Sequence, residues 1–103
     1  MATYGEASSE YGYPVVIPIA YPEDRNGLIY GIIFWGDVAG EFTLEINGEV
    51  RAGGRTSDQQ RTLQLDFSNA PIGVNMGDIL EVVATHYVQG LRMLKAVLLV
   101  RGV

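Results

Sequence analysis

Hydrophobic and polar positions alternate strictly in two short stretches of the chain. Residues Phe42–Ile46 read FTLEI, so three apolar side chains face one side of an extended chain and two polar ones face the other. Residues 61–67 repeat the pattern, with Leu63, Leu65 and Phe67 on the apolar side. Alternation with a period of two is typical of a β-strand that has one face on a core and one in water. These stretches therefore predict two half-buried strands of an antiparallel sheet.

Three other extended stretches are apolar on both sides. They are Val15–Ala20, Leu28–Trp35 and Met93–Val100. In a small antiparallel sandwich each sheet has one face on the core and one in water, so a single core cannot bury both faces of three strands. We expect something else to cover the outer faces: the connection at residues 68–78, the N-terminal segment, or another copy of the chain.

The stretch Ile79–Tyr87 and a hairpin strand that starts near Glu49 bring the total to about seven strands. No segment combines a helical period with helix caps. The pattern predicts an all-β fold: an antiparallel two-sheet sandwich of jelly-roll or Ig-like kind, with about seven strands and no substantial helix. At 103 residues the chain is long enough for one domain. We assign residues 14–103 to a single β-sandwich domain and residues 1–13 to an N-terminal arm, flexible or ordered on assembly.

Proline and glycine mark special positions inside the predicted strands. Pro18 has no N–H for a ladder, so its strand should lie at a sheet edge or switch between sheets there. Gly31 lies in the middle of an apolar run and predicts a bulge or a close approach by another group. Residues 52–60 (AGGRTSDQQ) are small and polar and are predicted to form a loop.

The dipeptide Asn47-Gly48 predicts a hairpin turn. A two-residue loop would set Ile46 opposite a charged residue and break the match of apolar faces. A three-residue loop with Gly48 in a G1 bulge pairs Leu44 with Val50 instead and keeps the apolar face continuous. We therefore predict the three-residue loop, and a two-residue type I′ turn would refute it.

Charge and composition exclude several classes of partner. The formal net charge is -5, Lys95 is the only lysine, and the arginines are scattered. Affinity for nucleic acid or anionic lipid comes from clustered Lys and Arg, so we expect no nucleic-acid partner and no membrane partner. The N-terminal residues lack the basic and apolar regions of a signal peptide, and no run approaches the roughly 20 apolar residues of a membrane span. We expect the protein in a virion or in another extracellular, assembly-associated setting.

Residues able to carry catalysis or to hold a metal are sparse. His86 is the only histidine and cysteine is absent, so a transition-metal site would have carboxylates alone beside it. The carboxylates lack the spacing of a calcium loop, and no serine sits on a nucleophile turn. We therefore predict that the protein is not an enzyme, that it has no catalytic, cofactor-binding or metal-binding residues, and that His86 is structural.

The surplus of apolar strand faces predicts a homo-oligomer, a ring or trimer as readily as a dimer. Three or four apolar side chains leaving water contribute about 1.5–3 kcal/mol each, enough to offset the cost of association. The arm adds three tyrosines, which carry more contact area than a solvated tail requires. The residues expected at the oligomer or partner interface are Tyr4, Tyr11, Tyr13, Ile29, Ile33, Val97 and Leu99.

An alternative function is a carbohydrate-binding module with a flat aromatic platform on an outer face. Trp35 followed by Gly36-Asp37 places an aromatic ring beside a hydrogen-bonding carboxylate. The competing interpretation places Trp35 in the core, because it ends an apolar run. The residues of the predicted platform are Trp35, Asp37, Tyr30 and Tyr87.

Three segments resemble a known kind of protein. Gly40–Gly48 (GEFTLEING), Arg61–Leu65 (RTLQL) and Gly77–Val82 (GDILEV) resemble the small β-sandwich accessory proteins of tailed-phage virions, such as capsid decoration proteins. The Gly-Asp entry and the final apolar strand also resemble the closing strands of trimeric jelly rolls of the TNF/C1q type. The resemblance implies a non-enzymatic structural protein, an oligomeric β-sandwich that decorates or builds a larger particle such as a virion shell or fibre.

Overall fold

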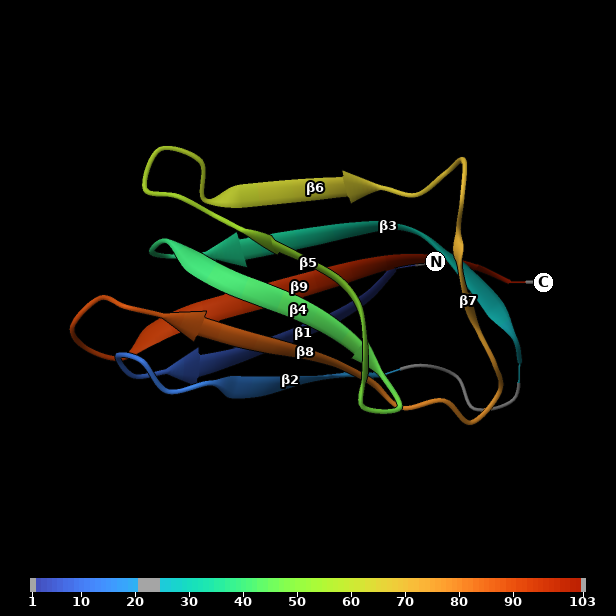
Figure 1. The fold of residues 1–103 in the computed structure, drawn as a ribbon, viewed down its shortest axis with the longest axis horizontal. Coiled ribbons are helices and arrows are strands. Elements are labelled where there is room, and N and C mark those ends of the chain that lie inside the picture. The colour runs from blue at the N-terminus through green and yellow to red at the C-terminus, as the bar shows by residue number, and fades with distance from the viewer. Residues whose placement is uncertain (1, 21–24, 103) are drawn as a thin grey trace.

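The computed structural model describes residues 2–20 and 25–102, which form strands and turns and contain no helix. The strands are β1 (Ala2–Ser9), β2 (Val15–Ile19), β3 (Gly27–Gly36), β4 (Gly40–Ile46), β5 (Glu49–Arg55), β6 (Thr62–Asp66), β7 (Ile72–Val74), β8 (Leu80–His86) and β9 (Arg92–Gly102). They build two antiparallel sheets that overlie one another (Figure 1), so the predicted all-β two-sheet sandwich is confirmed. None of the described residues belongs to a helix long and apolar enough to cross a bilayer.

The strand order places the longest apolar strands in the middle of one sheet. Sheet A has the order β1-β9-β3-β6, with the short β7 pairing with the start of β3, and sheet B has the order β2-β8-β4-β5. The strand that carries Pro18 is therefore an edge strand, as its missing N–H predicts.

The core lies between the two sheets. Phe34 of sheet A stacks on Phe42 of sheet B, with ring centroids 4.9 Å apart and an interplanar angle of 11°. The alternating face predicted for Phe42–Ile46 is buried there. Ile72 and Val74 are also buried, although their segment is a connection between sheets rather than a long strand. A single compact core thus accounts for one face of each sheet.

The hairpin after β4 differs from the predicted one. Ile46 pairs with Glu49 across a two-residue loop, and both Asn47 (φ 54°) and Gly48 (φ 79°) have positive φ, as a type I′ turn requires. The predicted three-residue loop is therefore wrong. The apolar match is restored further along, because a bulge shifts the register so that Leu44 pairs with Ala52. The extra residue sits inside the strand rather than in the turn.

The strand β5 continues through residues that were predicted to be a loop. Its last residues include Gly53 and Gly54, which usually weaken a strand. A side chain does not fit there: a Cβ on Gly54 would lie 2.3 Å from Leu63 Cδ2, and one on Gly53 would lie 3.0 Å from the Phe42 carbonyl oxygen. Gly54 therefore lets Leu63 of the neighbouring sheet approach the end of β5, and Gly53 lets β5 lie close to β4.

The bulge predicted at Gly31 is present, and it changes which residues share a face. The register between β3 and β9 shifts between Ile29 and Gly31, so Tyr30 is an extra residue. Ile29 and Ile32 both face the core as a result, and Ile33 faces outward. The prediction that Ile29 lies with Ile33 on the outer face is wrong for this reason.

Most of the predicted N-terminal arm is a strand of sheet A. Residues Ala2–Ser9 pair with β9 of the same chain, and residue 1 lies outside the described residues. The inward face of β1 packs against β2, because a Cβ on Gly5 would lie 2.7 Å from both Ile17 Cγ2 and the Pro18 carbonyl oxygen. Thr3 also donates a hydrogen bond to the Ala20 carbonyl. The first strand thus closes one side of the sandwich.

Candidate functional site

Sheet A carries an apolar outer surface, which we call the apolar face. In the strand register Tyr4 pairs with Val97 and Val97 pairs with Ile33, so the three form one row across β1, β9 and β3. Leu99 lies two residues along β9, and its side chain closes over Gly31, whose Cβ position is 3.0 Å from Leu99 Cδ1. The residues of the apolar face are Tyr4, Ile33, Trp35, Met93, Val97 and Leu99.

Lys95 is a cation on the apolar face, and it interacts with an aromatic ring and a carboxylate beside it. Lys95 Nζ lies 4.9 Å from the centre of the Trp35 ring and 3.7 Å from a Glu6 carboxylate oxygen. Tyr4 donates its hydroxyl to the same Glu6 oxygen, and this hydrogen bond raises the pKa of Tyr4 above its usual value. The charges therefore balance within the face, where Lys95 lies on β9 between Met93 and Val97.

The outer face of sheet B has a different character. Val16, Val83 and Thr43 form its central row, and the next row places Glu81 directly opposite Glu45. Two adjacent carboxylates disfavour burial against another protein surface. Sheet A therefore carries the larger group of outward apolar side chains, while sheet B adds Val16, Val50 and Val83.

The remaining predicted contact residues lie elsewhere. Ile29 is in the core, and Tyr11 and Tyr13 belong to the loop between β1 and β2, beyond the end of the strand that carries Tyr4. The predicted interface thus separates into two parts. Four of its seven residues, Tyr4, Ile33, Val97 and Leu99, come together on the apolar face.

The predicted aromatic platform is also divided. Trp35 and Tyr30 belong to β3, whereas Tyr87 follows β8 in the other sheet. Asp37 lies in the corner between β3 and β4, where its N–H donates to the Met93 carbonyl at 3.1 Å. One Asp37 carboxylate oxygen is buried without a hydrogen-bond partner. These four residues do not form one surface.

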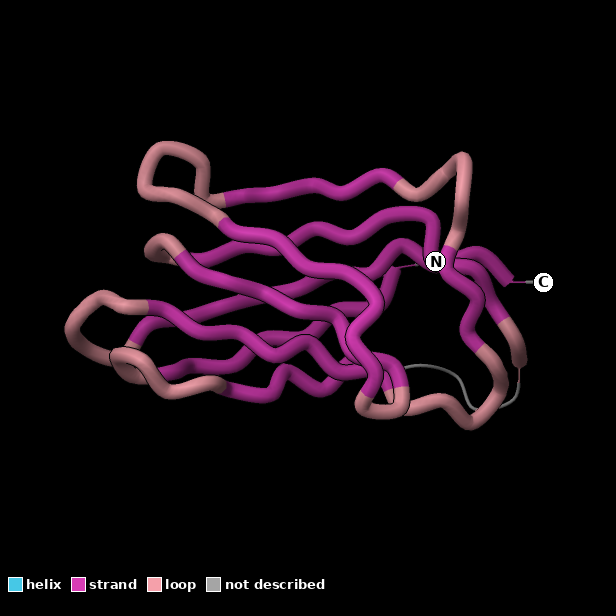
Figure 2. The backbone as a smooth tube through the Cα atoms, viewed as in Figure 1, coloured by secondary structure: helices cyan, strands magenta, loops and turns pink. Residues whose placement is uncertain are grey.

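Tyr87 instead joins a second surface at one end of the sandwich. The connections at residues 10–14, 37–39, 56–61 and 87–91 all lie at this end (Figure 2). Tyr87 is 56% exposed, and the Tyr11 ring meets it edge-on, with centroids 6.0 Å apart and an interplanar angle of 84°.

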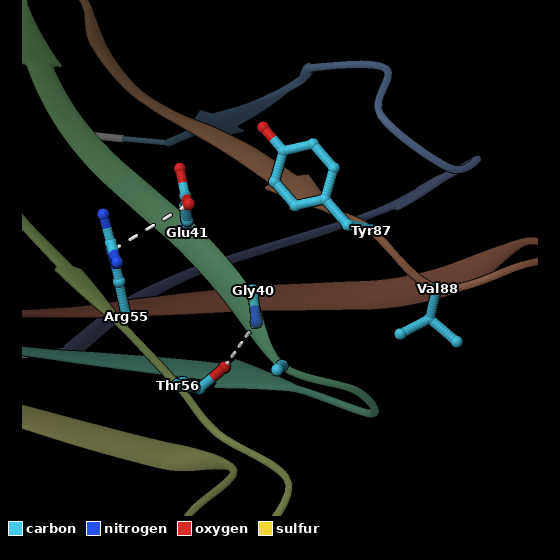
Figure 3. A pocket seen from close by; sticks show the side chains of 7 residues that line it. Gly40, Glu41, Arg55, Thr56, Tyr87 and Val88 are labelled. Atoms are coloured by element: carbon cyan, nitrogen blue, oxygen red, sulfur yellow. Dashed lines mark hydrogen bonds and ion pairs between the residues drawn. The ribbon is translucent and has the colours of Figure 1, made fainter.

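Beside Tyr87 lies an open cleft of about 230 Å³, which we call the tyrosine cleft. It is lined by Ala39, Gly40, Glu41, Arg55, Thr56, Tyr87 and Val88 (Figure 3). Arg55 Nε lies 3.9 Å from a Glu41 carboxylate oxygen, and Tyr87 and Arg55 project on either side of Glu41. Thr56 Oγ1 accepts a hydrogen bond from the Gly40 N–H at 3.0 Å, which joins the start of β4 to the residue after β5.

A neighbouring cleft of about 340 Å³ lies on the Tyr11 side of the tyrosine pair. It is lined by Glu10, Tyr11, Tyr13, Gln89 and Gly90. Sequence reasoning missed both clefts, because it placed Arg55 in a loop. Strand register supplies the missing signal: Glu41 pairs with Arg55 on one side and with Thr85, two residues before Tyr87, on the other.

His86 is buried beneath the β1–β2 and β8–β9 loops and forms hydrogen bonds with the backbone of both. Its side chain is fully buried, and its Nε2 donates to the Ser9 carbonyl oxygen at 2.5 Å. Its Nδ1 accepts the Val88 N–H at 3.2 Å, and its own carbonyl oxygen accepts the Gly12 N–H at 2.8 Å. A neutral imidazole with its proton on Nε2 satisfies both ring contacts. His86 thus joins the two loops that carry Tyr11 and Tyr87.

Comparison with known proteins bears on the fold. The sequence matches no protein-family model and no curated protein. Among solved structures, the chain is similar to the insecticidal delta-endotoxin Cry8Ea1 from Bacillus thuringiensis, with a TM-score of 0.51 and 13% sequence identity. The match covers 95% of this chain and 19% of the toxin, so the chain spans about a fifth of the toxin's length. At this identity the likeness shows a shared sandwich fold alone.

Proposed function

We propose that the protein is a non-enzymatic structural subunit that associates with further copies of itself through the apolar face of sheet A. The observation that carries the proposal is the unbroken row Tyr4–Val97–Ile33, with Trp35 and Leu99 beside it. A centre rich in aromatic and branched residues with a polar rim is the composition of a stable protein interface.

The size of this side of the molecule supports a stable contact. The molecule measures 42 × 24 × 20 Å, and its broad side spans the two longer dimensions (Figure 1). The rectangle of 42 × 24 Å, edges and loops included, is roughly 1,000 Å², and the apolar face is part of it, whereas a standard interface uses about 800 Å² of each partner. A second copy is the occupant that we propose, because a largely apolar face whose charges are balanced internally can pair with the same face of another copy about a two-fold axis.

The proposed role of the oligomer is to decorate or build a larger particle. The sequence resemblance to capsid decoration proteins of tailed phages supports a virion shell or fibre as that particle. The two broad sides of the sandwich suit such a role, since one is apolar and the other, with Glu45 and Glu81, is charged.

Native mass spectrometry and sedimentation at micromolar concentration test the proposal. We expect an oligomer for the natural sequence and a monomer for Val97→Glu, which places a charge in the central row. Val83→Glu is the matched control, because Val83 occupies the equivalent outward position on sheet B. A monomer from the natural sequence, or equal effects of the two variants, would overturn the proposal.

A further inference from the structure

We propose that the tyrosine cleft binds one ring of a neutral saccharide, with Tyr87 as its stacking surface, and that the cleft beside Tyr11 and Tyr13 receives the next ring of the same chain. The proposal concerns the loop end of the sandwich and does not depend on association through sheet A. Its basis is the way in which an exposed aromatic ring and a pair of charged side chains face one small cleft (Figure 3).

The Tyr87 ring is exposed but held in place. More than half of its surface is open to solvent, while Tyr11 supports it from one side through the edge contact. His86 fixes the backbone of both supporting loops. An aromatic ring held in this way loses little conformational entropy on binding, which favours recognition by stacking. A pyranose ring offers the matching surface, since its axial C–H groups form an apolar face.

The polar groups of the cleft suit the rim of a sugar ring. The Glu41 carboxylate accepts hydrogen bonds only, and the Arg55 guanidinium donates them only. Of two adjacent hydroxyl groups on a sugar ring, one can therefore donate a hydrogen bond to Glu41 and the other can accept one from Arg55. The ion pair between these residues is long and exposed, so the two heads are bound weakly to each other and are available to a third group.

The volume and the charge of the tyrosine cleft restrict the class of molecule that it can bind. The cleft, at about 230 Å³, lies below the range of roughly 300–1,000 Å³ typical of drug-sized sites, so it fits a single ring. The Glu41–Arg55 pair contributes no net charge, and the chain carries a formal charge of -5. A phosphorylated or otherwise anionic molecule is disfavoured on both grounds. The second cleft beyond the tyrosine pair gives a neutral chain room to continue.

Titration followed by two-dimensional amide NMR tests the proposal on the full chain. The probes are glucose, galactose, mannose and N-acetylglucosamine, together with the disaccharides cellobiose and lactose. We expect saturable shifts at the amides of residues 39–41, 55–56 and 87–88 with at least one monosaccharide. We also expect tighter binding of a disaccharide, with further shifts at residues 10–13.

Variants separate stacking from non-specific contact. Tyr87→Ala should weaken binding by about tenfold or more, because stacking on one aromatic ring typically contributes a kcal/mol or more. Tyr87→Phe keeps the ring and should retain binding, whereas Arg55→Met should weaken it. Met76→Ala removes a large side chain that is about as exposed as Tyr87 but lies in neither proposed surface, and it should leave binding unchanged.

Several results would contradict the inference. Absence of saturable binding by all six sugars would overturn it, as would equal losses in Tyr87→Ala and Met76→Ala. A disaccharide that binds no tighter than its monosaccharide would remove the second ring from the proposal. The variant Val97→Glu, designed to prevent association, should bind the same sugar as the natural sequence, so failure of the oligomer and failure of this site are distinguishable.

Discussion

Asn47 joins the β4–β5 turn to the loop before β8 through Asp78. The Asn47 side-chain nitrogen donates to an Asp78 carboxylate oxygen at 2.9 Å, and the Asn47 side-chain oxygen accepts the Ile79 N–H at 2.9 Å. The second Asp78 oxygen accepts the Asn75 N–H at 2.7 Å. The turn residue thus has two functions: it adopts the left-handed backbone conformation and it fastens the hairpin to the neighbouring loop.

This linkage should make stability depend on pH in the acid range. Hydrogen bonds from Asn47 and from the Asn75 backbone lower the pKa of Asp78 below its usual value of 3.8. A carboxyl group with a lowered pKa in the folded state stabilises the protein above the unfolded pKa, and this contribution disappears as the pH falls through the folded pKa. We expect Asp78→Asn to lose less thermal stability than the natural sequence when the pH is lowered from about 5 to about 2. Parallel melting curves for the two proteins would argue against the linkage.

The effect of replacing the adjacent Gly48 should depend only on how readily the new residue adopts a positive φ. Its φ is 79°, and a Cβ at this position would meet nothing within 4 Å. Gly48→Ala should therefore lower the free energy of unfolding by about 1–2 kcal/mol, the cost of a left-handed conformation for an ordinary residue. Gly48→Asn should cost less, since asparagine visits this region more readily. Equal effects in urea unfolding would indicate that the turn changes type in the variants.

The hairpin illustrates how far sequence reasoning extends. Alternation predicted the strands at Phe42–Ile46 and at residues 61–67, because each has one face on the core. It did not predict the register, because a bulge inside β5 restores the apolar match that the turn alone would break. Alternation with a period of two shows which side chains share a face of a strand, but it does not show where a bulge adds an extra residue.

The first strand was harder to predict for a different reason. Its inward residues include Thr3, Gly5 and Ser9, which are small or polar, so no apolar face marks the segment as a strand. At Gly5 there is no room for a side chain, because β2 runs directly against it. The apolar face was predictable from two-sided strands, whereas the tyrosine cleft was not, since Arg55, Glu41 and Tyr87 meet only through the pairing of β5, β4 and β8.

Gly5 offers a direct test of the first strand. A Cβ there would lie 2.7 Å from the Pro18 carbonyl oxygen, which belongs to the backbone and cannot move aside alone. Gly5→Ala should lower the free energy of unfolding by about 1–3 kcal/mol, the range of overpacked sites. Gly73→Ala is the control, because no atom lies within 4 Å of its added Cβ. Equal stability of the two variants in urea would show that residues 2–9 do not pack as described.

His86 provides the test of the scaffold beneath the tyrosines. Replacing it by leucine keeps an apolar body of similar size but leaves the Ser9 carbonyl and the Val88 N–H without their ring partner. Each unsatisfied buried group costs about 1–3 kcal/mol, so losing both partners in His86→Leu should lower the free energy of unfolding by about 2–6 kcal/mol. Thr85→Val, whose side chain faces outward on the same strand, should change it by less than about 0.5 kcal/mol.

Hydrogen exchange then separates a local effect from a global one. The amides of Gly12 and Val88 are both bonded to His86 in the natural sequence, one to its carbonyl and one to its ring. In His86→Leu the Val88 amide should exchange faster than the loss of global stability alone explains, while the Gly12 amide, whose acceptor is retained, should follow the global change. If both amides accelerate equally and only with global unfolding, the imidazole fills space without organising the loops, and the support that it gives to Tyr87 would have to come from Tyr11 alone.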